Sequence, residues 1–153
     1  MTKKKALFAG TFDPFTKGHA DIVRRGLLLF DRVVIAIGVN PNKSTYFSLE
    51  KRLEQIRCYY QYDDRVEVIA YTGLTVDLIK ETKSIALLRG IRSFLDYEYE
   101  KNLADLNSHL TGVDTVFLLT DQSLSHISSN AVRELLSYGK DVSSMLPEGF
   151  LLL

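Results

Sequence analysis

The sequence predicts an α/β fold, a single doubly wound domain of residues 1–153 built on a five-stranded parallel sheet. Three observations carry this prediction. Five short runs of β-branched and apolar residues lack polar alternation, helical periodicity fills the segments between them, and no repeat, low-complexity tract or Pro/Gly/Ser-rich linker divides the chain. Apolar strands joined by helical crossovers are typical of parallel sheets that are covered on both faces.

The predicted strands are the five short apolar runs, and each is followed by a polar or glycine-containing loop. They cover Ala6–Ala9, Val33–Gly38, Val66–Ala70, Ile85–Leu88 and Thr115–Leu119. In a doubly wound sheet, ligands bind beyond the carboxyl ends of the strands, where the strand order reverses. The loops that follow the strands are therefore the segments in which we expect the functional residues.

The predicted helices fill the intervals between the strands. The first covers residues 20–30 and places four apolar side chains on one face, those of Ile22, Val23, Leu27 and Phe30. Further helices are expected at Leu49–Tyr60, Thr75–Thr82 and Tyr97–Leu110, and a last one after Ser128. Ser48 and Ser128 are residues of the N-cap type, and Gly139 is expected to end the last helix.

Composition excludes several classes of protein. Lys and Arg number 19, as do Asp and Glu, so the formal net charge is zero and a whole-surface binder of nucleic acid or anionic membrane is disfavoured. No window approaches the roughly 18 apolar residues that a membrane span needs. The single cysteine, Cys58, cannot form an intrachain disulfide, so we expect a reducing, cytoplasmic location, with Cys58 filling the core.

The loop from Gly10 to His19 is the strongest candidate for binding phosphate. It begins and nearly ends with glycine and runs into a helix, whose N-terminal N–H groups attract anions. It contains neither a Walker A sequence nor a Gly-x-Gly-x-x-Gly turn. A single histidine at a helix start is also a common cap, so on this loop alone both interpretations of His19 remain open.

Two signatures narrow the interpretation. Thr16-Lys17-Gly18-His19 resembles the His/Thr-x-Gly-His signature of the nucleotidyltransferase superfamily, and Ile127–Arg133 resembles its second, serine-rich signature. Within that superfamily the chain resembles the bacterial phosphopantetheine adenylyltransferases along nearly its whole length. The matching segments are Gly10–Pro14, Pro41–Lys43 with Phe47–Arg52, Arg89–Glu100, which is the most specific, and Ile127–Ser129.

The resemblance implies a Rossmann-like nucleotidyltransferase fold and a reaction. The phosphate of 4′-phosphopantetheine attacks the α-phosphorus of ATP and gives 3′-dephospho-coenzyme A and pyrophosphate. Because the nucleophile is already an ionised phosphate, we expect hydrogen-bond donors and cations at the reaction centre, not carboxylates. The resemblance also implies that Mg²⁺ enters with ATP without a protein ligand that we can name, that coenzyme A is a feedback ligand, and that the chain forms a homohexamer.

The resemblance further implies which residues act. The catalytic set is His19, Thr11, Lys43 and Arg92, with His19 stabilising the transition state and with Lys43 and Arg92 holding the phosphate of 4′-phosphopantetheine. The nucleotide-contacting set is Gly10, Thr11, Phe12, His19, Arg89, Gly90, Ile91, Arg92, Glu100, Leu124, Ser125, His126, Ile127, Ser128, Ser129 and Asn130. The acceptor-binding set is Thr11, Lys43, Leu74, Thr75 and Arg89. Asn130 stands where the family often has Ser or Thr, Glu100 is equally well a helix-face charge, and Ser128 is equally well a cap.

Two other functions stay open from sequence alone. One is a sister nucleotidyltransferase with another phosphate acceptor, such as nicotinate mononucleotide or glycerol phosphate. The other is a catalytically silent nucleotide-binding regulator, against which the joint presence of Thr11, His19, Lys43 and Arg92 counts. The apolar segment Phe150–Leu153 is expected to dock in a core or an interface.

Overall fold

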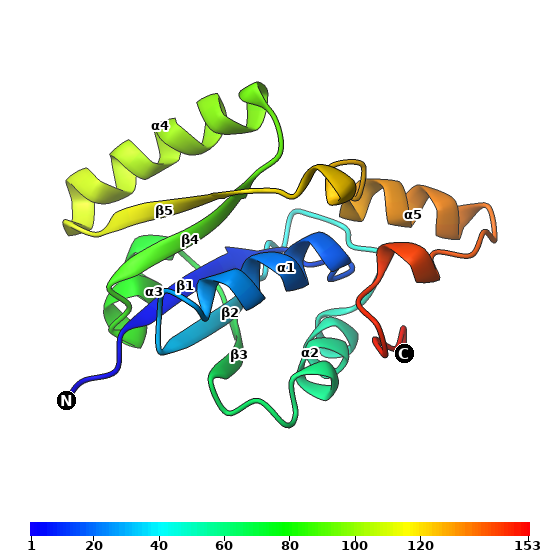
Figure 1. The fold of residues 1–153 in the computed structure, drawn as a ribbon, viewed down its shortest axis with the longest axis horizontal. Helices are drawn as coiled ribbons and strands as arrows, with labels where there is room; N and C mark the ends of the chain where they lie inside the picture. The colour runs from blue at the N-terminus through cyan, green and yellow to red at the C-terminus, as the bar shows by residue number, and fades with distance from the viewer.

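A computed structural model describes all residues 1–153 and contains one five-stranded sheet in which every pairing is parallel (Figure 1). The strand order is β3-β2-β1-β4-β5, which confirms the predicted doubly wound fold class. The strands are β1 (Lys5–Gly10), β2 (Arg32–Gly38), β3 (Val66–Tyr71), β4 (Ala86–Ile91) and β5 (Asp114–Leu119).

Five α-helices make the crossovers and the C-terminal layer. They are α1 (Lys17–Gly26), α2 (Leu49–Tyr59), α3 (Thr75–Thr82), α4 (Phe94–Thr111) and α5 (Ser129–Ser137), and two short 3₁₀ helices cover Gln122–Leu124 and Ser143–Met145. Ser48 and Ser128 accept hydrogen bonds from backbone N–H groups in the first turns of α2 and α5, so both predicted N-caps are confirmed. Gly139 follows α5 with φ +68°, a backbone conformation that suits glycine.

The two faces of the sheet carry different helices. Alternate residues of the buried strands point to opposite faces, so a nearly continuous apolar run serves both. In Figure 1, α1 lies in front of the sheet and α3 behind it. The front layer joins side chains of β1, α1, α2 and α5, including Phe8, Val23, Ile56 and Val132. The rear layer joins β1 and α3, including Leu7, Ala9, Leu78 and Ile79.

Helix α1 is shorter than predicted. The sequence predicts a helix to Phe30, but α1 ends at Gly26 and a hydrogen-bonded turn follows, which leaves Leu28 and Leu29 exposed. A Cβ on Gly26 would lie 2.6 Å from the Leu88 side chain, so glycine permits the close approach of the helix end to β4. Leu27 and Phe30 still pack against the core, as predicted.

Two other sequence expectations are wrong. Cys58 is exposed, because it lies about 200° around helix α2 from the buried Ile56. Strand β4 begins one residue later than predicted, with Ile85 exposed, and it continues to Ile91. Arg89 is therefore a strand residue rather than part of the loop after the strand, and it pairs with Phe117 of β5.

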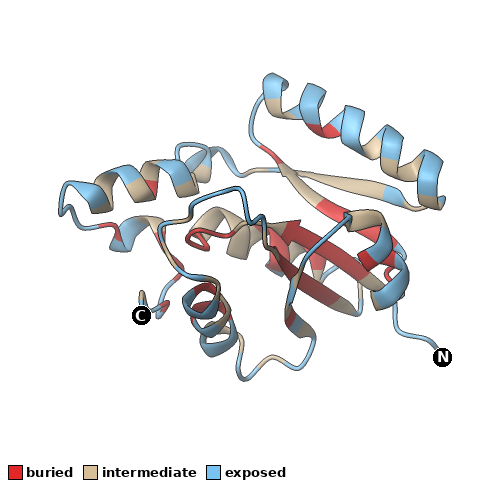
Figure 2. Cartoon of the chain, turned by 180° about the vertical axis from the view of Figure 1, so that it is seen from behind, coloured by how far each residue is buried: buried red, intermediate tan, exposed pale blue.

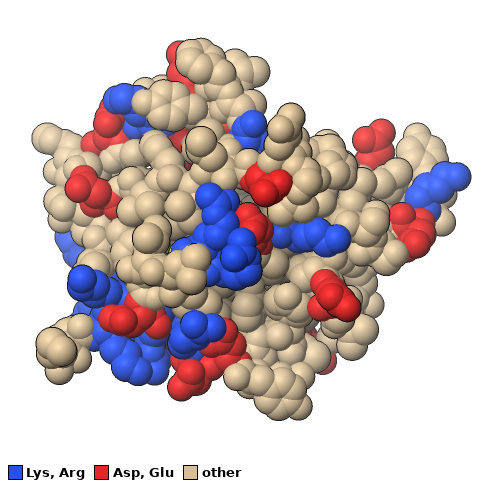
Figure 3. All heavy atoms as spheres, viewed as in Figure 1, with Lys and Arg blue, Asp and Glu red and all other residues tan.

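The outer surface carries a mixture of basic and acidic side chains. Basic and acidic side chains are interleaved over the face in Figure 3, in keeping with the balanced composition. Helix α4 covers β4 and β5 from the α3 side, yet only Glu100 of its residues is buried. Figure 2 shows this helix as mostly exposed. Of the segment Phe150–Leu153, Phe150 stacks on Phe15 and Leu152 packs against the core, as predicted, whereas Leu151 and Leu153 are exposed. None of the helices combines the length and apolar character that a membrane crossing needs.

Candidate active site

A cavity of about 420 Å³ lies at the carboxyl ends of β1 and β4. The chain leaves β1 toward β2 and leaves β4 toward β5, in opposite directions, so this is the switch point at which doubly wound sheets bind ligands. A second cavity of about 350 Å³ adjoins it. Residues that line both cavities are Ala9, Gly10, Thr11, Lys43, Arg89 and Glu100. Two ligands placed in the two cavities would therefore meet at Thr11, Lys43 and Arg89.

His19 lies in the first turn of α1 and is held there by Thr16. The Thr16 backbone N–H donates to His19 Nδ1 at 3.0 Å, and the Thr16 hydroxyl lies 3.1 Å from the same nitrogen. The His19 backbone N–H in turn donates to Thr16 Oγ1. Because Nδ1 accepts a backbone proton, the neutral ring carries its own proton on Nε2. His19 is thus a cap and also lines the larger cavity, so the two sequence interpretations hold together.

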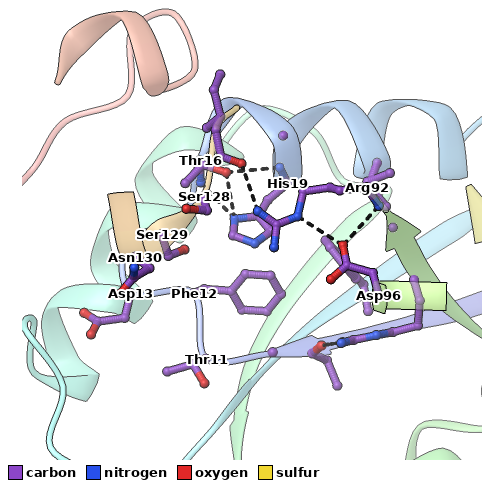
Figure 4. Close-up of a pocket in the computed structure, with 18 of the residues that line it drawn as sticks. Thr11, Phe12, Asp13, Thr16, His19, Arg92, Asp96, Ser128, Ser129 and Asn130 are labelled. Carbon is purple, nitrogen blue, oxygen red and sulfur yellow. Dashed lines mark hydrogen bonds and ion pairs between the residues drawn. The ribbon is translucent and has the colours of Figure 1, made fainter. Parts of the chain in front are cut away.

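Aromatic rings surround the His19 imidazole. Phe12 has a left-handed backbone with φ +51° that folds its ring back into the core, 5.0 Å from the His19 ring and edge-on to it (Figure 4). Phe15 lies 5.4 Å away on another side. Burial, and then the nearby charges of Arg89 and Arg92, lower the pKa of His19 to about 3. The ring is therefore a neutral donor at physiological pH rather than an imidazolium.

Arg89 is fixed by three contacts at the junction of the cavities. Its Nε and Nη2 donate to the two carboxylate oxygens of Glu100 at 2.9 and 2.6 Å, and its Nη1 donates to the backbone oxygen of Ala9. The Glu100 side chain is 10% exposed and that of Arg89 is 32% exposed. A bidentate pair of this kind sets the plane of the guanidinium. Glu100 is therefore the partner of Arg89 as well as a lining residue.

Arg92 and Lys43 supply the other cations of the predicted catalytic set. Arg92 follows β4 and forms an ion pair with Asp96 at 3.3 Å, and its Nη1 lies 3.5 Å from the backbone oxygen of Ile127. Figure 4 shows the Arg92 side chain reaching over the cavity between Asp96 and His19. The Lys43 ammonium, on the exposed loop after β2, makes no hydrogen bond or ion pair within the chain. It is the cation best placed to accept a new anionic partner.

The start of α5 forms the opposite wall. Ser128 accepts from the Ala131 backbone N–H as the N-cap, and the Ser129 hydroxyl donates to the backbone oxygen of Pro14 at 2.8 Å. Arg133, one turn further along, donates to the backbone oxygen of Asp13 at 2.8 Å. These bonds join the second signature to the first across the cavity, so the two ends of the sequence form one site.

Carboxylates are present in the cavity, which the sequence argument did not expect. Asp13, Asp96 and Glu100 all line it. Each is already engaged: Asp13 accepts two backbone N–H groups, Asp96 binds Arg92, and Glu100 binds Arg89. Their charge is thus directed at protein donors, and the side chains that remain open to a phosphate are hydrogen-bond donors and cations.

The structure brings most of the predicted site residues together. Those that line a cavity are Gly10, Thr11, Phe12, His19, Lys43, Thr75, Arg89, Gly90, Arg92, Glu100, Ile127, Ser128, Ser129 and Asn130. Leu74, Ile91, Leu124, Ser125 and His126 line neither: Ile91 is buried in β4, Leu74 is exposed at the start of α3, and Ser125 and His126 are exposed in the segment before α5. Their predicted contacts with ligand remain predictions.

Six polar or charged residues that line the larger cavity were not among the predicted site residues, namely Asp13, Thr16, Ser44, Asp96, Thr120 and Arg133. Thr16 and Arg133 lie inside the two signatures and Asp13 lies in the matching segment Gly10–Pro14, so the signal for these three residues was present. Asp13 and Arg133 act through hydrogen bonds to residues more than 30 positions away in the sequence. The periodicity of the sequence does not predict such contacts.

The chain is similar to one protein family and to several named relatives that share one activity in their names. The cytidylyltransferase-like family matches residues 7–135. The chain is 63% identical to the phosphopantetheine adenylyltransferase of Porphyromonas gingivalis over 152 residues, 99% of each chain. It is 47% identical to that of Bacteroides thetaiotaomicron, over 95% of this chain and 97% of the other. It is 48% identical to that of Flavobacterium johnsoniae, over 95% of each.

Among solved structures, the chain is similar to the lipopolysaccharide core biosynthesis protein of Thermoplasma volcanium. The TM-score is 0.56 at 19% identity, and the match covers 78% of this chain and 98% of that one. At this identity the likeness concerns the fold alone, and it agrees with the parallel five-stranded sheet.

Proposed function

Because the chain belongs to the phosphopantetheine adenylyltransferases of the cytidylyltransferase-like family, we propose that it transfers the adenylyl group of ATP to 4′-phosphopantetheine. The products are 3′-dephospho-coenzyme A and pyrophosphate, so the chain is a nucleotidyltransferase of coenzyme A biosynthesis. We propose that it works in the cytoplasm, where ATP is supplied. The observation that carries the proposal is the convergence of Thr11, Lys43 and Arg89 at the junction of two cavities.

The two cavities suit the two substrates. The larger one is lined by both signatures, including the start of α5, whose N–H groups attract the phosphates of ATP. The smaller one runs past Tyr71, Thr75 and Asn107, which offer hydroxyl and amide groups to an arm that contains amides. This arrangement would place the acceptor phosphate and the α-phosphate of ATP on either side of Thr11 and Lys43.

The reaction in this site is an in-line displacement. A non-bridging oxygen of the acceptor phosphate forms a bond to the α-phosphorus while the bond to the bridging oxygen of the pyrophosphate breaks. No proton needs to leave the nucleophile, because a phosphate monoester is already ionised at neutral pH. The His19 Nε2–H, Lys43 and Arg92 would then stabilise the charge that grows on the phosphoryl oxygens, and their fixed positions lower the cost of assembling two anions.

We propose that Mg²⁺ enters with ATP. No group of three or more His, Cys, Asp and Glu side chains is placed to hold a metal, so the phosphate oxygens and water are the ligands we expect. The ion would supply further positive charge on the transferring phosphates. Coenzyme A contains both halves of the product, so we also propose that it occupies the same two cavities as a feedback ligand.

We propose that the chain forms a homo-oligomer through α4, a homohexamer as in the resembling family. Exposed apolar side chains on this helix support the proposal, because an apolar face of this extent is unusual on a monomer. They are Phe94, Leu95, Tyr99, Leu106 and Leu110. Sedimentation equilibrium should give six times the chain mass of 17.4 kDa, and Leu106→Glu should reduce it. A wild-type monomer at micromolar concentration would contradict the assembly.

The direct test of the function is pyrophosphate release. Purified protein with ATP and Mg²⁺ should release pyrophosphate when 4′-phosphopantetheine is added. Nicotinate mononucleotide and glycerol phosphate, the acceptors of sister enzymes, serve as controls and should give only background. Turnover of either control without turnover of phosphopantetheine would replace the proposed acceptor, and no turnover of any would favour a silent nucleotide-binding regulator.

A further inference from the structure

Asp13 makes an unusual pair of contacts for a carboxylate in an anion-binding cavity. Its side chain is buried, with 3% of the residue's surface exposed. Oδ2 accepts from the Tyr46 backbone N–H at 2.7 Å, and Oδ1 accepts from the Phe47 backbone N–H at 2.9 Å. In Figure 4 the carboxylate points away from His19. A charged group is thus turned from the reaction centre toward two consecutive amides of a distant loop.

These amides belong to the loop that carries Lys43. Residues 40–44 of this loop are exposed, and their backbone bonds are local turns around Asn40. Hydrogen bonds that tie residues 40–47 to other parts of the chain come from Asp13 and from Arg52, whose Nε donates to the Phe47 backbone oxygen at 3.2 Å. Asp13 therefore anchors the loop three residues after Lys43.

Asp13 and Arg52 also connect the Lys43 loop to the other residues of the proposed reaction centre. Arg52 also donates to the backbone oxygen of Thr11 at 2.7 Å, and the backbone oxygen of Asp13 accepts from Arg133 of α5. A shift of Asp13 would thus change the distance between the Lys43 loop and the two signatures. Carboxylate bonds to backbone N–H groups are among the stronger hydrogen bonds in proteins, which suits an anchor.

We propose that Asp13 is a positioning residue for the acceptor phosphate, acting by fixing the Lys43 loop against the Thr11–His19 side of the site. The inference rests on the proposed function, since it takes Lys43 as the ligand of that phosphate. Asp13 touches neither substrate in this account. Without the Asp13 carboxylate, the loop no longer holds Lys43 in position, while the start of α5, which forms the nucleotide side of the cavity, stays in place.

The test is Asp13→Asn, which keeps the shape of the side chain but turns an NH₂ group toward one of the two backbone N–H groups. We expect the dissociation constant of 4′-phosphopantetheine to rise roughly tenfold, the scale for one lost charge-assisted bond, and that of ATP to change less than twofold. Isothermal titration measures both. In a Lys43→Ala background the same change should alter acceptor binding less than twofold, because Asp13 acts through Lys43.

The matched control is Asp141→Asn, since Asp141 also accepts a backbone N–H, that of Ser143 at 2.9 Å, but is exposed and lines neither cavity. It should leave both affinities unchanged. Equal weakening of ATP and acceptor by Asp13→Asn, or an undiminished loss in the Lys43→Ala background, overturns the proposal.

A second variant protects the test if Asp13→Asn does not fold. Thr45→Val removes the bond of 2.7 Å from the Thr45 hydroxyl to the Phe47 backbone oxygen and loosens the same turn without touching the buried carboxylate. It should show the same acceptor-selective loss, and equal loss for both ligands overturns the proposal. An inactive wild-type protein refutes the proposed function and this inference together, whereas an active wild type with the wrong variant pattern refutes the inference alone.

Discussion

The Thr16 backbone N–H donates to His19 Nδ1 at 3.0 Å, so one histidine both closes the first turn of α1 and keeps its ring proton on Nε2. The carboxylate or amide of a capping box is here replaced by an imidazole at the same position of the helix. Local helix capping thereby fixes the tautomer of a ring that lines the larger cavity. The chemistry proposed for His19 depends on this bond.

Replacing His19 should therefore lower turnover more than binding. His19→Ala and His19→Gln should each lower kcat by roughly 10²–10³, the scale for one lost transition-state donor, and change the dissociation constant of ATP far less. Gln can accept the same capping bond, so His19→Gln should keep the thermal stability of the wild type. His109→Ala, at an exposed position of α4, is the control. Equal losses in kcat and ATP affinity would contradict the role.

The pKa of His19 also predicts a pH dependence of stability. As pH falls below the ordinary value of 6.5, the unfolded chain takes up a proton at this histidine, while the folded chain does so only near the lowered pKa of about 3. The unfolded state then binds more protons, so this residue makes the fold less stable as pH falls from 6.5 toward 3. Urea unfolding at pH 7 and pH 5 should show a smaller decline for His19→Gln than for the wild type; an equal or steeper decline would count against it.

Breaking the Arg89–Glu100 pair should destabilise the fold. Glu100→Ala leaves the Arg89 charge without its partner, and because Arg89 is partly exposed we expect a loss of about 1–3 kcal/mol rather than the larger cost of a fully buried pair. Asp105→Asn breaks the exposed Lys101–Asp105 pair on the same helix and should change the stability far less, because solvent screens both charges. Urea denaturation gives the free energy of unfolding of both variants. A similar decrease in both would contradict a larger contribution from the Arg89–Glu100 pair.

The two acceptor-side cations should be separable from the nucleotide site. Lys43→Ala and Arg92→Ala should each raise the dissociation constant of 4′-phosphopantetheine roughly 10- to 100-fold, with a smaller effect on ATP, because each loses a charge-assisted bond to the acceptor phosphate. Lys51→Ala, an exposed lysine of α2, is the matched control. Isothermal titration with each ligand alone measures the effect. A larger loss of affinity for ATP than for 4′-phosphopantetheine would show that these residues bind the nucleotide instead.

Much of the fold could be read from the sequence, because buried parallel strands are short apolar runs and crossover helices have a 3.6-residue period. The places where prediction failed are specific. Helix α1 ends at Gly26, which lies against Leu88, a contact between residues 62 positions apart that periodicity does not reveal. Cys58 was assigned to the core from its residue type, whereas its position on α2 places it in solvent.

The site was predictable where a signature names the residue and not where a long-range bond gives the residue its role. Gly10, Thr11 and His19 line the larger cavity as expected. The expectation of donors and cations came from the charge of the nucleophile, and it could not show that Asp13 lines the cavity while its carboxylate is directed at the backbone of a loop 33 residues away. Partners of buried charges are set by tertiary contacts, and these are absent from composition and spacing.

The central claim is that this site joins the adenylyl group of ATP to 4′-phosphopantetheine. The most direct measurement is a competition: the protein, Mg²⁺ and ATP are incubated with equal amounts of 4′-phosphopantetheine, nicotinate mononucleotide and glycerol phosphate, and the nucleotide products are identified by mass. We predict 3′-dephospho-coenzyme A as the nucleotide product, with one pyrophosphate for each molecule formed. A different adenylylated product, or ADP and phosphate in place of pyrophosphate, would contradict the account.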